Sequence, residues 1–163
     1  VSTSGSDETG TGSDASKFAS IQAALNFVGA YQNIHVASGI YYEHVEWILE
    51  GNEDGTPSDA TKNIQLIGEN RDNTIIDGYD SGRPLYIEWG DSTNSISGFT
   101  LRNGIADDGG GLKMYRSGMK VSDMIIDDNS AENNGGGVYW SSAAYTWISP
   151  SHFNNVIISA VFK

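Results

Sequence analysis

Aromatic and charged side chains recur at matching positions of a repeated strand pattern. A glycine triplet followed by alternating apolar residues begins at Gly109, and it begins again 26 residues later at Gly135, with a fainter copy from Arg83 to Ile87. Side chains of a strand alternate between two faces, so aligned residues of the copies share one face. Aromatic rings beside hydrogen-bonding groups are suited to contact sugars. The predicted ligand-binding residues are therefore Tyr86, Glu88, Lys113, Tyr115 and Tyr139, and the predicted partner is a polysaccharide.

Two acidic stretches provide oxygen ligands of the kind that calcium prefers. The first is a polar segment predicted as an inserted loop, and it contains Glu53, Asp54 and Asp59. In the second, Asp77 and Asp80 flank Gly78 and Tyr79. Neither stretch has the spacing of a helix–loop–helix calcium site, and acidic residues at such positions commonly form turns. Calcium is the cofactor that the sequence suggests, although no motif requires a cofactor.

The elements that position these residues are short β-rich runs. Each glycine-rich strand follows a second apolar run that ends in Asn or Asp, such as Ile96–Asn103 and Val121–Asn129. A period of about 25 to 30 residues with two strands per period is typical of a solenoid. Alternation predicts that Leu85, Leu112 and Val138 point inward, and the residues two further on are Ile87, Met114 and Trp140. Corner asparagines are expected to tolerate left-handed backbone and to bond neighbouring strands.

The domain organisation expected from these patterns is simple. Residues 1–16 are polar and predict a flexible leader, and residues 17–163 predict one β domain. Apolar residues recur at three- and four-residue steps from Phe18, which predicts a helix over about 17–30, with Ser16 as its N-cap and Gly29 at its exit. At the end of a stack of strands, such a helix would cover the open core.

Composition excludes several kinds of site. The formal net charge is −12, which argues against binding to nucleic-acid phosphates. There are no cysteines, so disulfides and thiolate metal sites are excluded. No apolar run is long enough to cross a membrane, so no membrane insertion is expected. The glycine triplets do not lead into a helix, as a phosphate-binding loop requires.

These phrases, taken in order, resemble the right-handed parallel β-helix proteins of the pectin-lyase-like superfamily. The resemblance covers about residues 17–158, and its other matching phrases are Val36–Glu43, Ile64–Glu69 and Thr74–Gly78. It implies an all-β, right-handed parallel β-helix (a solenoid) with an N-terminal capping α-helix. It also implies a bacterial exported protein, secreted or on the cell surface.

The same resemblance implies chemistry that the residues support weakly. Polysaccharide lyases of this superfamily use Lys or Arg as a base, and the candidates here are Lys113 and Arg116. Its glycoside hydrolases use acidic residues near the comparable strand, where this chain has Asp107 and Asp108. The three histidines stand outside the phrase that those hydrolases need. Whether the chain is an enzyme is left open.

The alternatives are a structural or adhesive segment of a larger exported protein without catalysis, and a fragment of a lyase or hydrolase. The pattern stops after Lys163 without a visible cap. We therefore expect an incomplete C-terminal end, with self-association through its uncapped last coil.

Overall fold

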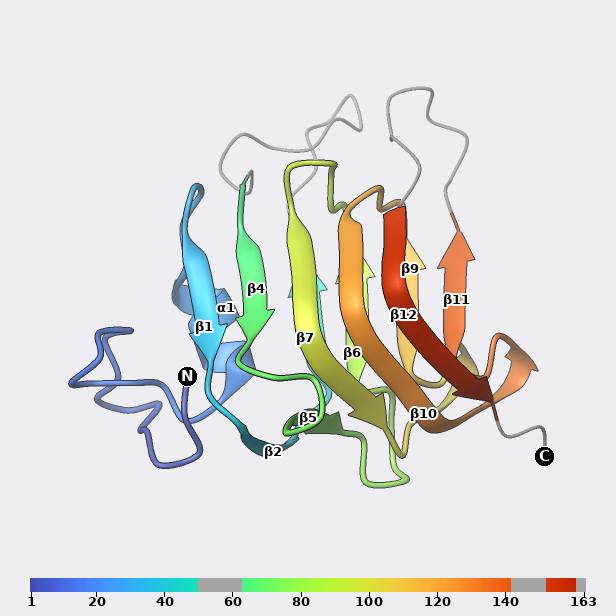
Figure 1. Cartoon of the computed structure of the whole chain (residues 1–163), viewed down its shortest axis with the longest axis horizontal. Helices are drawn as coiled ribbons and strands as arrows, with labels where there is room; N and C mark the ends of the chain where they lie inside the picture. The colour runs from blue at the N-terminus through green and yellow to red at the C-terminus, as the bar shows by residue number, and fades with distance from the viewer. Residues whose placement is uncertain (50–62, 142–151, 161–163) are drawn as a thin grey trace.

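The structure is a computed structural model, and it describes residues 1–49, 63–141 and 152–160 (Figure 1). Within these residues the chain is mostly β, with a single short helix. The elements are α1 (Ile21–Phe27), β1 (Asn33–Val36), β2 (Gly39–Tyr42), β3 (Val45–Ile48), β4 (Gln65–Gly68), β5 (Thr74–Asp77), β6 (Leu85–Glu88), β7 (Ser95–Arg102), β8 (Ile105–Asp108), β9 (Leu112–Tyr115), β10 (Lys120–Asn134), β11 (Val138–Ser141) and β12 (His152–Ala160).

The strands pair in parallel and form two sheets. The larger sheet has the order β1-β4-β7-β10-β12, with β2 and β5 joined to it beside β7 and β8 joined beside β10. The smaller sheet has the order β3-β6-β9-β11. Every described strand pair is parallel, so neighbouring strands in a sheet are joined by crossover connections and not by hairpins. In Figure 1 the smaller sheet lies behind the larger one.

The predicted fold class, an all-β right-handed parallel β-helix with an N-terminal capping helix, is corrected by this arrangement. The structure supports a mostly β chain whose strands form parallel sheets of a Rossmann-like α/β-type arrangement, and the described residues show no solenoid. Sequence periodicity reports which residues form strands and which side chains share a face. It does not report the path by which successive strands are connected, and the prediction failed at that step.

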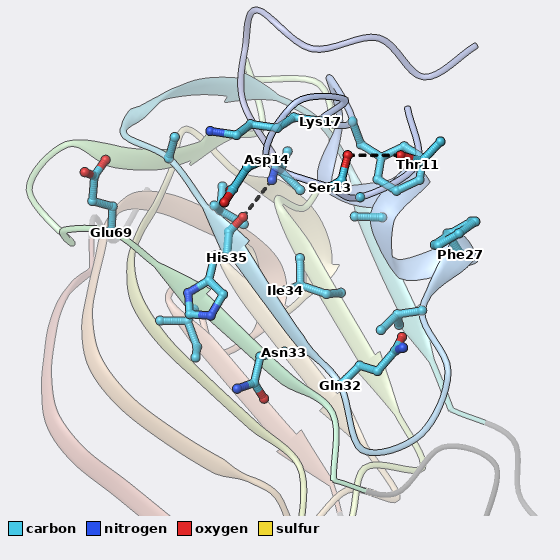
Figure 2. A pocket seen from close by; sticks show the side chains of 18 residues that line it. Thr11, Ser13, Asp14, Lys17, Phe27, Gln32, Asn33, Ile34, His35 and Glu69 are labelled. Atoms are coloured by element: carbon cyan, nitrogen blue, oxygen red, sulfur yellow. Dashed lines mark hydrogen bonds between the residues drawn. The ribbon is translucent and has the colours of Figure 1, made fainter. Parts of the chain in front are cut away.

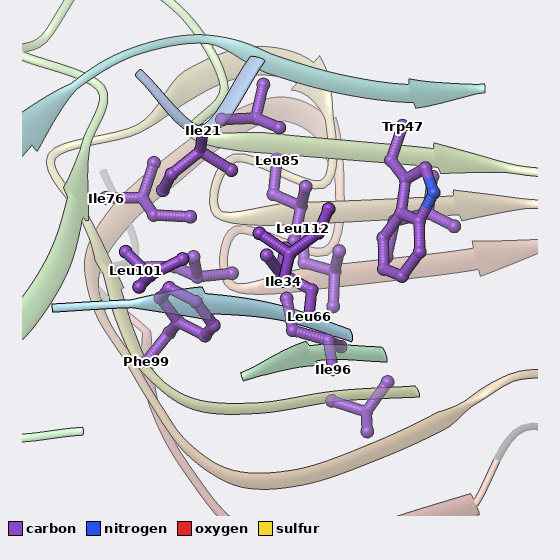
Figure 3. Packing of buried hydrophobic residues seen from close by; sticks show 14 of the residues in the cluster. Ile21, Ile34, Trp47, Leu66, Ile76, Leu85, Ile96, Phe99, Leu101 and Leu112 are labelled. Carbon is purple, nitrogen blue, oxygen red and sulfur yellow. The ribbon is translucent and has the colours of Figure 1, made fainter. Parts of the chain in front are cut away.

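The core lies between the sheets and is built from residues that alternate along each strand (Figure 3). Ile34, Leu66, Ile96 and Val121 are register partners in consecutive strands of the larger sheet, and all four are buried. In the smaller sheet, Leu85 and Leu112 are partners in the same way. Burying one such side chain contributes about 1.5–3 kcal/mol. This stacking of like residues fixes the register, because a slip by one residue would turn every apolar side chain to solvent.

The helix is shorter than expected and begins later. Its N-cap is Ser20, whose hydroxyl accepts a hydrogen bond from the Ala23 amide at 3.1 Å, so the prediction of Ser16 as N-cap is wrong. Glu43 also accepts hydrogen bonds from the Ile21 and Gln22 amides, at 2.9 and 3.0 Å. A carboxylate 21 or 22 residues away in sequence thus satisfies the free amides of the first turn.

The N-terminal residues lie against the start of the helix segment. The amide of Ser2 donates to the Phe18 carbonyl at 2.9 Å, and the amide of Ser6 donates to the Lys17 carbonyl at 2.9 Å. That residues 1–16 form a flexible leader stays a prediction. Among the described residues, no helix is both long enough and apolar enough to span a bilayer.

Candidate functional site

The predicted binding residues lie on the outer face of the smaller sheet. Tyr86 pairs with Lys113, and Lys113 pairs with Tyr139, so these three form one row across β6, β9 and β11. Glu88 pairs with Tyr115 in a second row two residues further along the strands. The alignment predicted from the repeat is therefore confirmed as backbone register. The alternating partners on the inner face are buried, as Leu112 and Met114 are, which turns the rows outward.

Strand β3 extends both rows by one residue each. Glu46 pairs with Tyr86, and Ile48, which is exposed, pairs with Glu88. The repeat does not predict these two residues, because β3 and β6 are not separated by the usual period. The aligned residues Val45 and Leu85 are 40 positions apart, compared with 27 between Leu85 and Leu112. Apolar residues at every second position from Val45 to Trp47 are the sequence pattern that could have predicted this strand.

The first part of the face is organised around Tyr86. Its hydroxyl donates a hydrogen bond to Glu88 Oε2 at 2.7 Å, and the Arg83 guanidinium lies 5.9 Å from the centre of its ring. Burial, followed by the hydrogen bond to Glu88, raises the pKa of Tyr86 above its ordinary value. Arg83 in turn donates to the carbonyls of Asp108 and Gly109 at 2.6 and 2.7 Å. Tyr86 is therefore a neutral, oriented ring at physiological pH.

Lys113 occupies the centre of the same row. Its ammonium lies 5.3 Å from the centre of the Tyr139 ring and 3.5 Å from Asp108 Oδ2. The other oxygen of Asp108 accepts a hydrogen bond from the Asn134 side chain at 2.9 Å. The hydrogen bond from Asn134, followed by that from Lys113, lowers the pKa of Asp108. Asp108 is thus held in its charged form and fixes the position of the lysine.

Arg116 lies at the end of the face, directly after β9. Its guanidinium lies 4.8 Å from the ring centres of both Trp89 and Tyr115. Trp89 and Arg116 have left-handed backbone, with φ of 64° and 48°, directly after β6 and β9. Cation–π contacts of this kind contribute about 0.5–1 kcal/mol each at exposed sites.

The weak catalytic candidates are Asp107, Asp108, Lys113 and Arg116, and the structure places them as follows. Asp107 and Asp108 are consecutive residues of β8, so their side chains point to opposite faces of that strand. Two carboxylates that act on one glycosidic bond must flank it from a shared cleft. Lys113 is paired with Asp108, and Arg116 stacks on two rings. The face supplies groups that can bind a ligand, and catalysis by any of these four residues stays a prediction.

Two of the calcium candidates, Asp77 and Asp80, lie among the described residues. Asp77 is buried, and its oxygens accept hydrogen bonds from Arg102 Nε at 2.8 Å and from the Asn103 side chain at 3.0 Å. Asp80 is exposed, and its amide donates to the Asn103 carbonyl. Glu53, Asp54 and Asp59 lie outside the described residues. Over the part of the chain that the structure describes, no three His, Asp or Glu side chains converge as metal ligands. Calcium binding stays a prediction.

The C-terminal strand carries the surface on which self-association was predicted. Among the described strands, β12 is the last in the order of the larger sheet. Phe153, Ile157 and Ile158 of this strand are 40%, 49% and 50% exposed. Trp140, which was expected to point into the core, is 40% exposed on β11, and its indole nitrogen donates to the Ser117 carbonyl at 2.8 Å. Association through this end stays a prediction.

Comparison with known proteins gives no relative. No protein family, no curated protein and no solved structure shows a significant match to the chain. The resemblance to the pectin-lyase-like superfamily stays an expectation from the sequence, and the evidence on function lies in the outer face of the smaller sheet.

Proposed function

We propose that this chain is a secreted or cell-surface module that binds a polysaccharide on the outer face of the β3-β6-β9-β11 sheet. The observation that carries the proposal is the row Tyr86–Lys113–Tyr139, in register across three parallel strands, with Glu88 and Tyr115 beside it. Rings and polar groups repeat there along one direction, which matches a ligand that is itself a repeating chain.

The spacing of the sheet supports an extended ligand. Neighbouring strands lie about 4.8 Å apart, so the rows present one side chain per strand at that interval. A polymer lying across the strands would meet successive side chains of one row without bending. The side chains of the face are half-buried on a sheet surface, and such a surface suits a long chain better than an enclosed small molecule.

The side chains of the face are held before any ligand arrives. Tyr86 is bonded to Glu88, Lys113 is paired with Asp108, and Arg116 lies between two rings. Ligand binding therefore has to immobilise few additional side chains. Each side chain that is already held lowers the entropic cost of binding by about 0.5–1.5 kcal/mol. Preorganised aromatic contacts are the feature expected of a binding surface.

The charges of the face nearly cancel. Arg83, Lys113 and Arg116 stand near the acidic side chains of Glu46, Glu88 and Asp108. A strongly anionic polymer would meet these three carboxylates, and the chain as a whole carries a net charge of −12. A neutral polysaccharide is the class that this balance favours.

The test is affinity electrophoresis on a soluble neutral β-glucan and, separately, on polygalacturonate, supported by a glycan panel. We expect retardation on a neutral glycan. We expect Tyr115→Ala to weaken binding about twofold to tenfold, since one aromatic contact contributes about 0.5–1.5 kcal/mol. Tyr31→Ala is the matched control, because Tyr31 is 72% exposed and lies just before β1, away from this face. Circular dichroism of both variants checks that the fold is kept.

Other outcomes would contradict the proposal in distinct ways. A chain that binds no glycan would be a structural or adhesive segment. Unsaturated uronate absorbance would show a lyase, and then Lys113→Ala should abolish the product. New reducing ends without that absorbance would show a hydrolase. Equal losses in Tyr115→Ala and in Tyr31→Ala would place the binding surface elsewhere.

A further inference from the structure

Apolar and polar side chains alternate across the outer face of the smaller sheet, and not only along its strands. Each of the four strands places one side chain in each of two rows. From β3 to β11, the first row is Glu46, Tyr86, Lys113 and Tyr139. The second row, two residues further along the strands, is Ile48, Glu88, Tyr115 and Ser141. On every strand one of the two side chains is aliphatic or aromatic and the other is polar, and the apolar one changes row from each strand to the next.

The apolar side chains therefore follow a zigzag over the sheet. Tyr86 stands in the first row, Tyr115 in the second and Tyr139 in the first again, and Ile48 continues the alternation on β3. Strands lie about 4.8 Å apart and two residues along a strand span about 6.6 Å, so these groups stand alternately on the two sides of a line that crosses the strands. A ligand along that line meets an apolar group on one side and a polar group on the other, and the two sides exchange at each strand.

The side chains of the pattern are accessible and are held in place. Ile48 is 55% exposed, and the side chains of both rows on β6 and β9 are half-buried. The Tyr86 hydroxyl donates to Glu88 across the two rows of its own strand, and the Arg116 guanidinium lies 4.8 Å from the centre of the Tyr115 ring. The inner-face residues of β6 and β9 are buried, so a slip of register that scrambled the pattern would also expose the core.

One class of neutral polysaccharide has the same alternation. In a chain of pyranoses joined by equatorial bonds at opposite ring carbons, as in a β-1,4-linked glucan, each sugar is turned over relative to the one before it. One edge of each sugar carries the hydroxymethyl arm and the other edge carries two neighbouring hydroxyl groups, so the two edges exchange sides at every unit. The chain is extended, and each sugar advances it by close to one strand spacing. Glucans with α-1,4 or β-1,3 bonds coil instead, and their edges do not exchange sides in this way.

We propose that the face binds a linear β-1,4-linked polysaccharide that crosses the strands with one sugar on each, in alternating orientation, a proposal that rests on the function proposed above and adds the linkage of the ligand. The hydroxymethyl edges lie against the apolar groups, such as Tyr86 and Tyr115. The hydroxyl edges lie against the polar groups, where Glu88 accepts hydrogen bonds and Lys113 donates them.

A second place for a small sugar lies on another part of the molecule and provides a control. A hollow of about 610 Å³ lies between the N-terminal residues, α1 and β1, and His35 is among the residues that line it (Figure 2). None of the described residues that line this hollow belongs to the two rows. His35→Ala therefore alters the hollow and leaves the face as it is.

The test is isothermal titration calorimetry with three tetrasaccharides of glucose that differ only in linkage, which is β-1,4, β-1,3 or α-1,4. We expect the β-1,4 compound to bind at least tenfold more tightly than the other two, and at least tenfold more tightly than its own disaccharide, which reaches two strands instead of four. His35→Ala should bind it as the original chain does. Equal affinity for the three linkages, or no binding of the β-1,4 compound, overturns the proposed linkage. The proposed function fails separately, when the glycan panel shows no binding at all.

An exchange of two residues tests the alternation itself. Lys113→Tyr combined with Tyr115→Lys keeps the composition of the face but moves the ring of β9 into the row of Tyr86 and Tyr139. We expect at least tenfold weaker binding of the β-1,4 tetrasaccharide, with circular dichroism as the check on folding. If this variant fails to fold, Ile48→Gln replaces it, because Ile48 is exposed on the edge strand. Ile48→Gln should weaken binding at least threefold, and more than Ile48→Leu does. Unchanged binding in the exchange variant or in Ile48→Gln overturns the proposal.

Discussion

Asn129 is the residue whose removal should show most directly what holds neighbouring strands together. It is fully buried in β10. Its side-chain oxygen accepts a hydrogen bond from the Gly104 amide at 2.8 Å, and its side-chain nitrogen donates to the Leu101 carbonyl at 3.0 Å. A Cβ at Gly104 would lie 2.7 Å from the Asn129 oxygen, and one at Gly111 would lie 2.6 Å from its nitrogen. Glycines at these two positions leave the room that the asparagine fills.

The size of the effect follows from the two groups that Asn129→Ala leaves without a partner. A buried donor or acceptor that loses its hydrogen bond costs about 1–3 kcal/mol. Two such groups, the Gly104 amide and the Leu101 carbonyl, give about 2–6 kcal/mol. Water that enters the vacated space would form hydrogen bonds with these two groups and would reduce the loss. We therefore expect the free energy of unfolding to fall by about 2–4 kcal/mol.

The assay is urea unfolding followed by tryptophan fluorescence, with the free energy of unfolding taken by linear extrapolation. Asn133→Ala is the matched control, since Asn133 is exposed in the same strand, and its change should stay within about 0.5 kcal/mol. A loss below about 1 kcal/mol for Asn129→Ala would refute the reasoning, as would equal losses for the two variants.

Two further predictions concern pH. Burial by itself raises the pKa of Asp77, but hydrogen bonds from Arg102, Asn103 and the Tyr79 amide outweigh it, so the folded pKa is lowered. Asp77 therefore adds to the free energy of unfolding above the unfolded pKa of 3.8, and this contribution is lost as the pH falls through the lower folded pKa. In unfolding measurements at decreasing pH, Asp77→Asn should lack this loss. An acid-induced loss of stability that is the same in Asp77→Asn as in the original chain would contradict the assignment. Burial, followed by Glu43 and Glu69, raises the pKa of Tyr41 from 10.0 to about 12. As the pH rises, the tyrosine loses its proton in the unfolded chain first, so the free energy of unfolding should fall between about pH 10 and 12. The urea midpoint of unfolding should fall less over that range in Tyr41→Phe. An equal fall in the two proteins would count against this prediction.

Several features of this protein are determined by the sequence alone. Alternation predicted strands β6 and β9 with their buried faces, and the alignment of Tyr86, Lys113 and Tyr139, because the side-chain direction in a strand depends only on position along it. The role of corner asparagines was predicted as well. Asn103 has left-handed backbone with φ of 53°, and Asn129 bonds the main chain of the neighbouring strand.

Other features depend on residues far apart in the sequence, and the tertiary structure decided them. Periodicity could not give the connection path, so the solenoid prediction was wrong. It could not place the start of α1, which is fixed by Ser20 and by Glu43 from beyond β2. Nor could it show that Arg102 and Asn103 occupy the oxygens of Asp77, or that a hollow lies between α1 and β1. Local pattern sets the direction in which a side chain points, whereas its partner is set by whichever atoms the fold brings there.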